Sequence, residues 1–182
     1  TPADISVGTR LAMMEMLASG VVSFSDMYDR THVTAEEVIS SGMRANLNRP
    51  ILGFDPTETY ESSNRVRESL RFYDEWNGAG DGRVVADFSI HAEYTSFEQL
   101  VQPYAADCLK RGARMHLHLS ETAKEHEECK ARHGKTPTRW FFDLGVMDSP
   151  VIAAHCVAVE PADMDILARQ GVTCVHNPSS NM

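Results

Sequence analysis

The feature that most constrains the fold of this chain is a regular alternation of short β-rich runs and amphipathic helices. The helical segments are about 10 to 15 residues long and the β-rich runs are bounded by turn residues, a pattern typical of repeated β-α-β units with a parallel sheet. The expected strands span residues 21–28, 44–54, 83–92, 114–121, 151–156 and 172–178, six in all.

The helix signals are equally regular. In the first helix, Leu11, Met14 and Leu17 recur at the spacing of one helical face, and Gly20 stands where a helix ends. Thr34 is expected to cap the second helix. The expected helices span residues 1–20, 33–43, 61–78, 96–112, 122–134, 136–145 and 160–171.

The polar residues at the strand ends favour one α/β architecture. No glycine-rich phosphate loop follows any strand, which argues against a doubly wound dinucleotide-binding sheet. Polar groups instead stand at the C-terminal ends of strands, where a (β/α)8 TIM barrel assembles its active site. These rim residues are Asp26, His91, Glu121, His155 and Asn177. Because such a barrel needs eight strands and usually about 250 residues, we expect residues 1–182 to be an internal piece of a parallel (β/α)8 barrel.

The composition argues against nucleic acid and membranes as partners and favours a cytoplasmic location. The net charge is −9 and no Lys/Arg cluster forms a stripe, which argues against nucleic acid as a partner. No apolar run approaches the roughly 20 residues that span a bilayer, and no leader segment opens the chain, so no membrane association is expected. The four cysteines form no CxxC pair, which indicates a reduced, cytoplasmic protein.

The stretch RMHLHLSETAKEH, residues 114–126, carries the densest chemistry. Alternate side chains of a strand share a face, so His116 and His118 point the same way, and Glu121 lies just past the strand, within reach of His118. A neutral imidazole is a good zinc ligand, and an adjacent carboxylate can shuttle protons for a metal-bound water. The alternative is two barrel-interior histidines bonded to polar neighbours, since an HxH pair alone is a weak signal.

Two further histidines strengthen the metal interpretation. His91 ends the preceding expected strand in FSIHAEYTS, and His155 ends the following one in VIAAHC. Three successive strands therefore present a histidine at one rim, which favours a shared site. Cys156 is expected to face the opposite side of its strand from His155, which argues against a thiol nucleophile.

Four motifs taken in order resemble a known family. SIHAEYTS around His91, HLSET from His118, AAHCV around His155 and HNPSSN from His176 are similar to the amidohydrolase superfamily, in its branch of purine and nucleoside-type deaminases and chlorohydrolases. The resemblance implies a metal-dependent hydrolytic deaminase in which His118 is a metal ligand on the fifth strand and Glu121 is the proton shuttle. It implies that His155 contacts the metal or the attacking hydroxide, which adds to the amidine carbon of an aminopurine.

The chain also departs from that family. Family members carry an HxH pair on the first barrel strand, an aspartate ligand on the eighth and a flanking β-domain, so the chain is expected to supply about six strands, the second to the seventh. The resemblance implies one divalent metal in the intact protein, Zn²⁺ first, with Fe²⁺ and Mn²⁺ as alternatives. His118 and His155 alone fall short of the three protein ligands of a catalytic zinc. His116 has no fixed family role and is expected to be structural.

In two further places the chain resembles the methylthioadenosine and S-adenosylhomocysteine deaminase branch of the family. Arg49 in LNRPILGFD and Arg65 in SSNRVRESLRFYDEWNG match arginines that face the ribose and carboxylate ends of the substrate. A guanidinium suits a carboxylate tail. His91 matches a histidine that reaches the sugar. The structural alternatives are a solvated helix residue for Arg65 and a rim histidine bonded to a backbone carbonyl for His91.

The motifs of the sequence are also compatible with other functions. Guanine deaminases and triazine-type chlorohydrolases belong to the same superfamily. The chain taken alone is alternatively a catalytically silent barrel fragment, oligomeric or poorly soluble because of its open sheet edges. For the intact protein, a small-molecule substrate and a homo-oligomer are expected.

Overall fold

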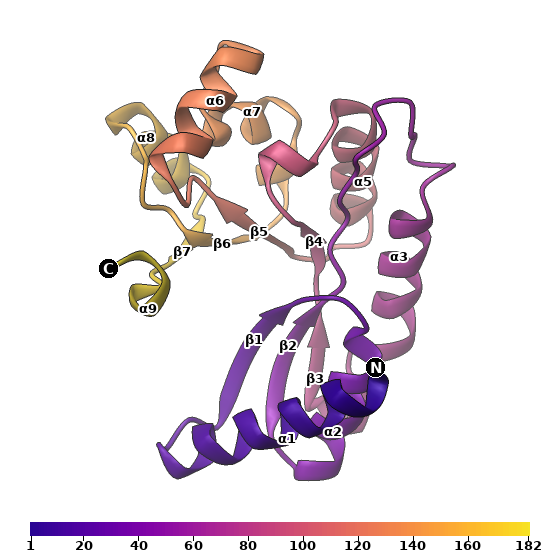
Figure 1. Ribbon diagram of the computed structural model, residues 1–182. Coiled ribbons are helices and arrows are strands. Elements are labelled where there is room, and N and C mark those ends of the chain that lie inside the picture. The colour runs from indigo at the N-terminus through magenta and orange to yellow at the C-terminus, as the bar shows by residue number, and fades with distance from the viewer. The chain divides into compact units, whose positions relative to one another are not determined.

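The computed structural model describes all 182 residues, and helices alternate with strands along the chain (Figure 1). The chain divides into two compact units, each with a parallel sheet of its own. Unit 1 comprises Thr1–Pro50 and Arg67–Phe88, and unit 2 comprises Ile51–Val66 and Ser89–Met182. None of the helices combines the length and the apolar character that a membrane crossing requires. The expected α/β class with parallel strands is confirmed.

Unit 1 is built on a three-stranded parallel sheet. Its elements are α1 (Pro2–Ala18), β1 (Ser23–Met27), α2 (Thr31–Ser41), β2 (Arg44–Asn48), α4 (Ala79–Gly82), β3 (Val84–Ala86) and, from Arg67 onward, α3 (Asn64–Trp76). The strands run side by side in the order β1-β2-β3 (Figure 1), with Phe24 paired to Ala45 and Ala45 to Val84. Buried apolar side chains from the helices, such as Val38 and Phe72, cover this sheet and form the core of the unit.

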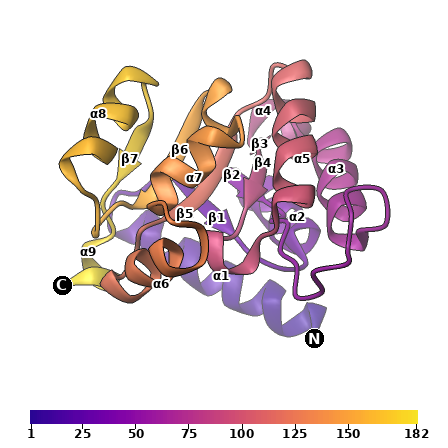
Figure 2. The same ribbon diagram turned by 90° about the horizontal axis from the view of Figure 1, so that it is seen from above.

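Unit 2 is built on a four-stranded sheet in the order β4-β5-β6-β7 (Figure 2). Its elements are β4 (Phe88–Ile90), η1 (Glu93–Thr95), α5 (Glu98–Lys110), β5 (Met115–Leu119), α6 (Ala123–His133), α7 (Pro137–Asp143), η2 (Val146–Asp148), β6 (Val151–His155), α8 (Pro161–Arg169), β7 (Thr173–Val175) and α9 (Pro178–Asn181). The central strand β5 is almost entirely buried, as expected for a parallel strand with both faces covered. Threonine N-caps begin α6 and α7, with Thr122 and Thr136 each accepting a backbone N–H.

The strand expected over residues 83–92 is divided into two strands in the structure. β3 ends at Ala86 and β4 begins at Phe88, so the prediction of a continuous strand over 83–92 is wrong and the chain has seven strands instead of six. Asp87 makes the break, because its N–H donates to the Asn48 side chain at 3.0 Å instead of to a strand carbonyl. Its carboxylate also accepts a hydrogen bond from Asn46 Nδ2 at 2.6 Å.

The expected cap of the second helix is also wrong. α2 begins at Thr31 and its N-cap is Arg30, with a left-handed φ of 55°, so Thr34 lies inside the helix. Thr31 is buried and its hydroxyl donates to the Tyr28 carbonyl at 2.9 Å. This bond holds the turn before the helix and allows α2 to start one residue after the left-handed Arg30.

The residues that give the first helix its apolar spacing are largely exposed in the structure. Met13 is 2% exposed, whereas Leu11, Met14 and Leu17 are 47% to 67% exposed. Arg10 Nε pairs with Glu37 Oε2 of α2 at 2.5 Å, and Met13 lies one turn further along the same face of α1. Met13 Sδ also accepts a hydrogen bond from Ser41 of α2 at 3.4 Å, so the side of α1 that carries Arg10 and Met13 packs on α2.

Candidate active site

Three histidines of unit 2 lie in a row at the C-terminal ends of neighbouring strands. His91 follows β4, His118 lies near the end of β5 and His155 ends β6. The ring centroids of His91 and His118 are 5.2 Å apart, and those of His118 and His155 are 5.4 Å apart. The backbone fixes this alignment, since the His118 N–H donates to the His91 carbonyl at 3.1 Å and Leu119 pairs with His155.

The two outer imidazoles each have one ring nitrogen bonded within the protein. His91 Nδ1 lies 2.8 Å from Thr95 Oγ1, and His155 Nδ1 lies 2.9 Å from Asn181 Oδ1. An amide oxygen only accepts hydrogen bonds, so the His155 proton is assigned to Nδ1 and its Nε2 keeps a lone pair. Neither ring nitrogen of His118 is hydrogen bonded. The central imidazole therefore has the most freedom to bind a ligand.

Burial acts on the titration of two imidazoles of the row, His91 and His118. Burial lowers the pKa of His118 to about 4, and repulsion from the neighbouring imidazoles of His91 and His155 acts in the same direction. Burial also lowers the pKa of His91. A neutral imidazole is the form that coordinates a metal ion.

Glu121 stands beside the row on the turn that leaves β5. Its side chain is 34% exposed, and its Oε1 lies 3.6 Å from His155 Nδ1. The preceding residue, Ser120, has a φ of 47°, a left-handed conformation that non-glycine residues rarely adopt. This conformation ends the strand alternation and turns the chain toward α6. A carboxylate in this position can accept a proton from a bound substrate or water and return it.

The side chains of the row are of the type that binds a divalent metal, but they are too few to form a complete site. Imidazole nitrogens and a nearby carboxylate suit zinc, which in catalytic sites takes three protein ligands. No group of three or more His, Cys, Asp or Glu side chains in the structure is arranged to hold a metal ion. Among the residues of this chain, the ring nitrogens of His118 and Nε2 of His155 are the donors of the row that could ligate a metal. His116 is buried, at 6% exposed, and lies one strand repeat before His118.

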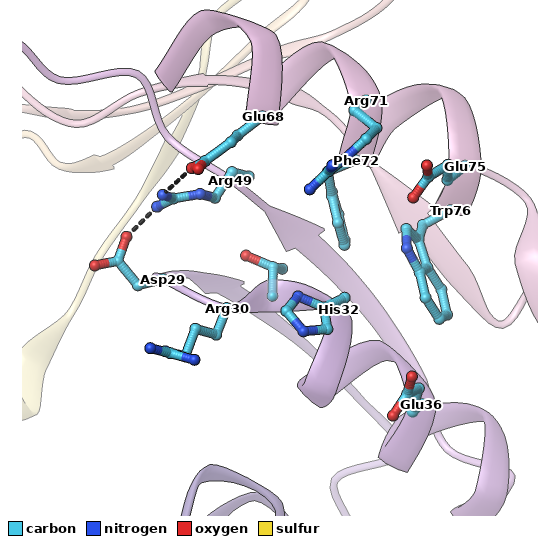
Figure 3. Close-up of a pocket in the computed structure, with 11 residues that line it drawn as sticks. Asp29, Arg30, His32, Glu36, Arg49, Glu68, Arg71, Phe72, Glu75 and Trp76 are labelled. Carbon is cyan, nitrogen blue, oxygen red and sulfur yellow. Dashed lines mark hydrogen bonds and ion pairs between the residues drawn. The ribbon is translucent and has the colours of Figure 1, made fainter. Parts of the chain in front are cut away.

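Arg49 lies in unit 1, where it follows β2. It lines a cavity of about 630 Å³ between α2 and α3, shown in Figure 3. Its guanidinium bridges the carboxylates of Asp29 and Glu68, and its side chain is 12% exposed. A substrate carboxylate would therefore have to displace one of these two acidic partners to bind Arg49.

Arg65 lines a different cavity, in unit 2. It stands near the start of α3, and its cavity of about 430 Å³ also has Phe54, Asp55 and Thr57 in its wall. The Asp55 carboxylate accepts hydrogen bonds from the N–H and hydroxyl of Thr57, which fold this loop on itself. The structure thus places the two expected substrate-binding arginines in separate cavities.

Sequence reasoning missed three polar residues that hold this site. Thr95 bonds the His91 ring, Asn181 bonds the His155 ring, and Glu125 accepts two backbone N–H groups at the Glu121 turn. Two of them had a usable signal. Asn181 belongs to the HNPSSN motif, and Glu125 completes the capping-box pattern TAKE of residues 122–125.

Comparison with known proteins defines the class. The profile of the amidohydrolase family matches residues 1–182, so the chain belongs to that family. A 5-methylthioadenosine/S-adenosylhomocysteine deaminase of Pelotomaculum thermopropionicum is 40% identical over 181 residues, which are 100% of this chain and 41% of that protein. A 5'-deoxyadenosine deaminase of Methanosarcina acetivorans is 36% identical, over 98% of this chain and 41% of that protein. The chain thus spans about two fifths of the length of these curated relatives.

A solved structure gives the same class. An adenosine deaminase of Xanthomonas campestris with bound zinc superposes with a TM-score of 0.86 at 27% sequence identity. The match covers 100% of this chain and 41% of that one. The family assignment made from the HLSET and AAHCV motifs is therefore confirmed.

Proposed function

We propose that the intact protein is a metal-dependent hydrolytic deaminase of aminopurine nucleosides of the methylthioadenosine and S-adenosylhomocysteine type. The observation that carries the proposal is the row of three imidazoles at neighbouring strand ends, with the Glu121 carboxylate 3.6 Å from His155. Membership of the amidohydrolase family and relatives named as deaminases support it.

The architecture of the intact domain is part of the proposal. We infer that residues 1–182 form the section of a (β/α)8 TIM barrel from its second to its seventh strand. The first and eighth strands and a flanking β-domain would belong to the intact protein beyond this section. The parallel sheets of both units and the fold similarity to the zinc-bound adenosine deaminase support this placement.

Each residue of the row has a distinct proposed role. A divalent metal held by His118, zinc first, would supply a water polarised for attack on the amidine carbon. Glu121 takes a proton at a carboxylate oxygen and delivers it to the purine ring and then to the departing amine. His155 faces the reacting carbon with Nε2, since its Nδ1 is held by Asn181. His91, anchored by Thr95, orients the sugar.

The substrate assignment rests on the arginines and on the relatives. From the family resemblance, Arg65 is proposed to meet the carboxylate end of S-adenosylhomocysteine. A substrate role of Arg49 stays a prediction, because its guanidinium is paired with Asp29 and Glu68 and it lines another cavity. Guanine deaminase and triazine hydrolase chemistry are the alternatives within the family. A homo-oligomer and a cytoplasmic location are proposals from the sequence, and the four free cysteines are compatible with a reducing compartment.

Ammonia release by the full-length protein tests the proposal. The zinc-loaded protein is expected to release ammonia from S-adenosylhomocysteine and methylthioadenosine, and to lose this activity after treatment with a chelator. Guanine is assayed in parallel for ammonia release, and a chlorotriazine for chloride release. Hydrolysis of either of these without activity on the nucleosides would overturn the substrate class, and inactivity on every compound would overturn the enzyme assignment.

A further inference from the structure

Glu125 occupies an unusual position at the start of α6. Its side chain is 5% exposed, and its two carboxylate oxygens accept two successive backbone N–H groups. Oε1 accepts from Ser120 at 3.1 Å, and Oε2 accepts from Glu121 at 2.8 Å. A buried carboxylate with both oxygens bonded to one turn restrains the backbone of that turn.

This arrangement differs from an ordinary helix cap. In a capping box, the third residue of the helix bonds the N–H of the N-cap residue itself, here Thr122. The Thr122 side chain does accept the Glu125 N–H at 3.1 Å. The Glu125 carboxylate, however, reaches past Thr122 to the two residues before it. It therefore secures the turn between β5 and α6, which carries Glu121.

The opposite side of the turn is fixed by the segment that follows His155. The Ser120 carbonyl accepts the N–H groups of Val157 at 3.1 Å and Ala158 at 2.8 Å. Ser120 itself has a φ of 47°, a region that is unfavourable for a residue with a side chain, so it needs outside support. Glu125 supplies that support on the N–H side and the loop after β6 supplies it on the carbonyl side.

From this geometry we propose that Glu125 is a positioning residue for Glu121. It holds the left-handed Ser120 turn and thereby sets the placement of the Glu121 carboxylate relative to His155. The proposal deepens the function proposed above and rests on it for its kinetic readout. The Glu125 carboxylate bonds the backbone of the turn and takes no part in proton transfer.

Glu125→Gln in the full-length, zinc-loaded protein tests the idea. The amide of glutamine can accept one of the two N–H groups, but its NH₂ group faces the other as donor against donor. We expect kcat per bound zinc to fall about 100-fold, the loss typical of misplacing a catalytic group by about 1 Å. KM and zinc content are expected to stay near their wild-type values. Glu127→Gln, on the same helix with a side chain 70% exposed, is the matched control and should change neither constant.

A double variant separates positioning from a general structural effect. If Glu125 acts through Glu121, Glu121→Gln combined with Glu125→Gln should be no slower than Glu121→Gln alone. Losses that multiply would overturn the proposal, as would a wild-type kcat in Glu125→Gln. If Glu125→Gln does not fold, Glu125→Asp keeps the charge but is one methylene too short to span both N–H groups. An intermediate loss of kcat is then expected, and none would overturn the proposal.

Amide hydrogen exchange needs no substrate, so it tests the positioning role of Glu125 independently of the proposed deaminase function. Amide hydrogen exchange at Ser120 and Glu121 should be faster in Glu125→Gln than in the wild type and unchanged in Glu127→Gln. Faster exchange in a protein that deaminates nothing would support the restraint of the turn and overturn only the enzymatic function. Unchanged exchange would overturn the role of Glu125 whatever the activity.

Discussion

The polar groups at the strand ends of the two units are used in opposite ways. In unit 1, Asn46, Asn48 and Asp87 bond one another, with Asn46 to Asp87 and Asn48 to Asn46 contacts of 2.6 Å. In unit 2, His118 stands between two other imidazoles with no hydrogen bond to its ring nitrogens. A closed network of buried polar groups stabilises one conformation, whereas an open row keeps lone pairs for a ligand. The difference indicates that the histidine row of unit 2 is open to a ligand, whereas the Asn46–Asn48–Asp87 network of unit 1 is already bonded within itself.

The largest effect is expected at Glu121. Glu121→Gln in the full-length protein should lower kcat by about 10² to 10⁴, because an amide cannot carry the proton. Zinc content and substrate binding should be unchanged, as measured by metal analysis and by calorimetric titration with a non-hydrolysed analogue. A variant with near-normal turnover would remove Glu121 from the chemistry and with it the contrast between the units.

His118 provides the next largest effect. His118→Ala should weaken zinc binding by at least the roughly 10- to 100-fold that loss of an outer-shell partner costs. His32→Ala, at an exposed position of α2 in unit 1, is the control and should retain full zinc occupancy. Competition with a chelating dye measures both affinities. Full zinc occupancy in His118→Ala would show that the open row is not the ligand site.

The third prediction concerns the substrate preference that Arg65 of unit 2 is proposed to give. If its guanidinium meets a substrate carboxylate, Arg65→Ala should reduce kcat/KM on S-adenosylhomocysteine more than on adenosine, by about 1.5 to 3 kcal/mol of transition-state stabilisation. Arg67→Ala, an exposed position of the same helix, serves as the control. Equal losses on both substrates would remove the reason to prefer a substrate with an amino-acid tail.

Substitution of Asn48 is expected to have the smallest effect, and to change only the stability of the protein. Asn48 is fully buried and accepts the Asp87 N–H, so Asn48→Ala leaves that N–H unbonded and should cost about 1 to 3 kcal/mol of unfolding free energy. Urea denaturation of the full-length protein measures it, with the exposed Gln102→Ala as control. The kcat of the folded fraction should not change. A large loss of kcat would mean that the unit 1 network also takes part in catalysis.

The sequence predicts the order of elements well because alternating strands and helices leave a strong local pattern. The positions of His91, His118 and His155 at successive strand ends follow from that pattern and from parallel pairing. The break at Asp87 does not follow, since it depends on side-chain bonds to Asn46 and Asn48, which lie about 40 residues earlier.

The remaining errors have the same origin in long-range contacts. The apolar spacing of Leu11, Met14 and Leu17 correctly predicts a helix, but these side chains are exposed in the structure, whereas Met13 is buried and Arg10 pairs with Glu37 of α2. The bond from His155 to Asn181 likewise joins residues 26 positions apart. A local pattern contains no information on such partners until the fold brings them together.

The position of the bound metal in the full-length protein decides whether His118 is a metal ligand and Glu121 is not. A crystal structure of the zinc-loaded protein, with the metal located by anomalous diffraction at the zinc edge, is the decisive measurement. We expect a zinc ion about 2.0 to 2.1 Å from a ring nitrogen of His118, with the Glu121 carboxylate beside it but not bound to it. A zinc ion bound without His118, or with Glu121 as a direct ligand, would show that the proposed roles of these two residues are wrong.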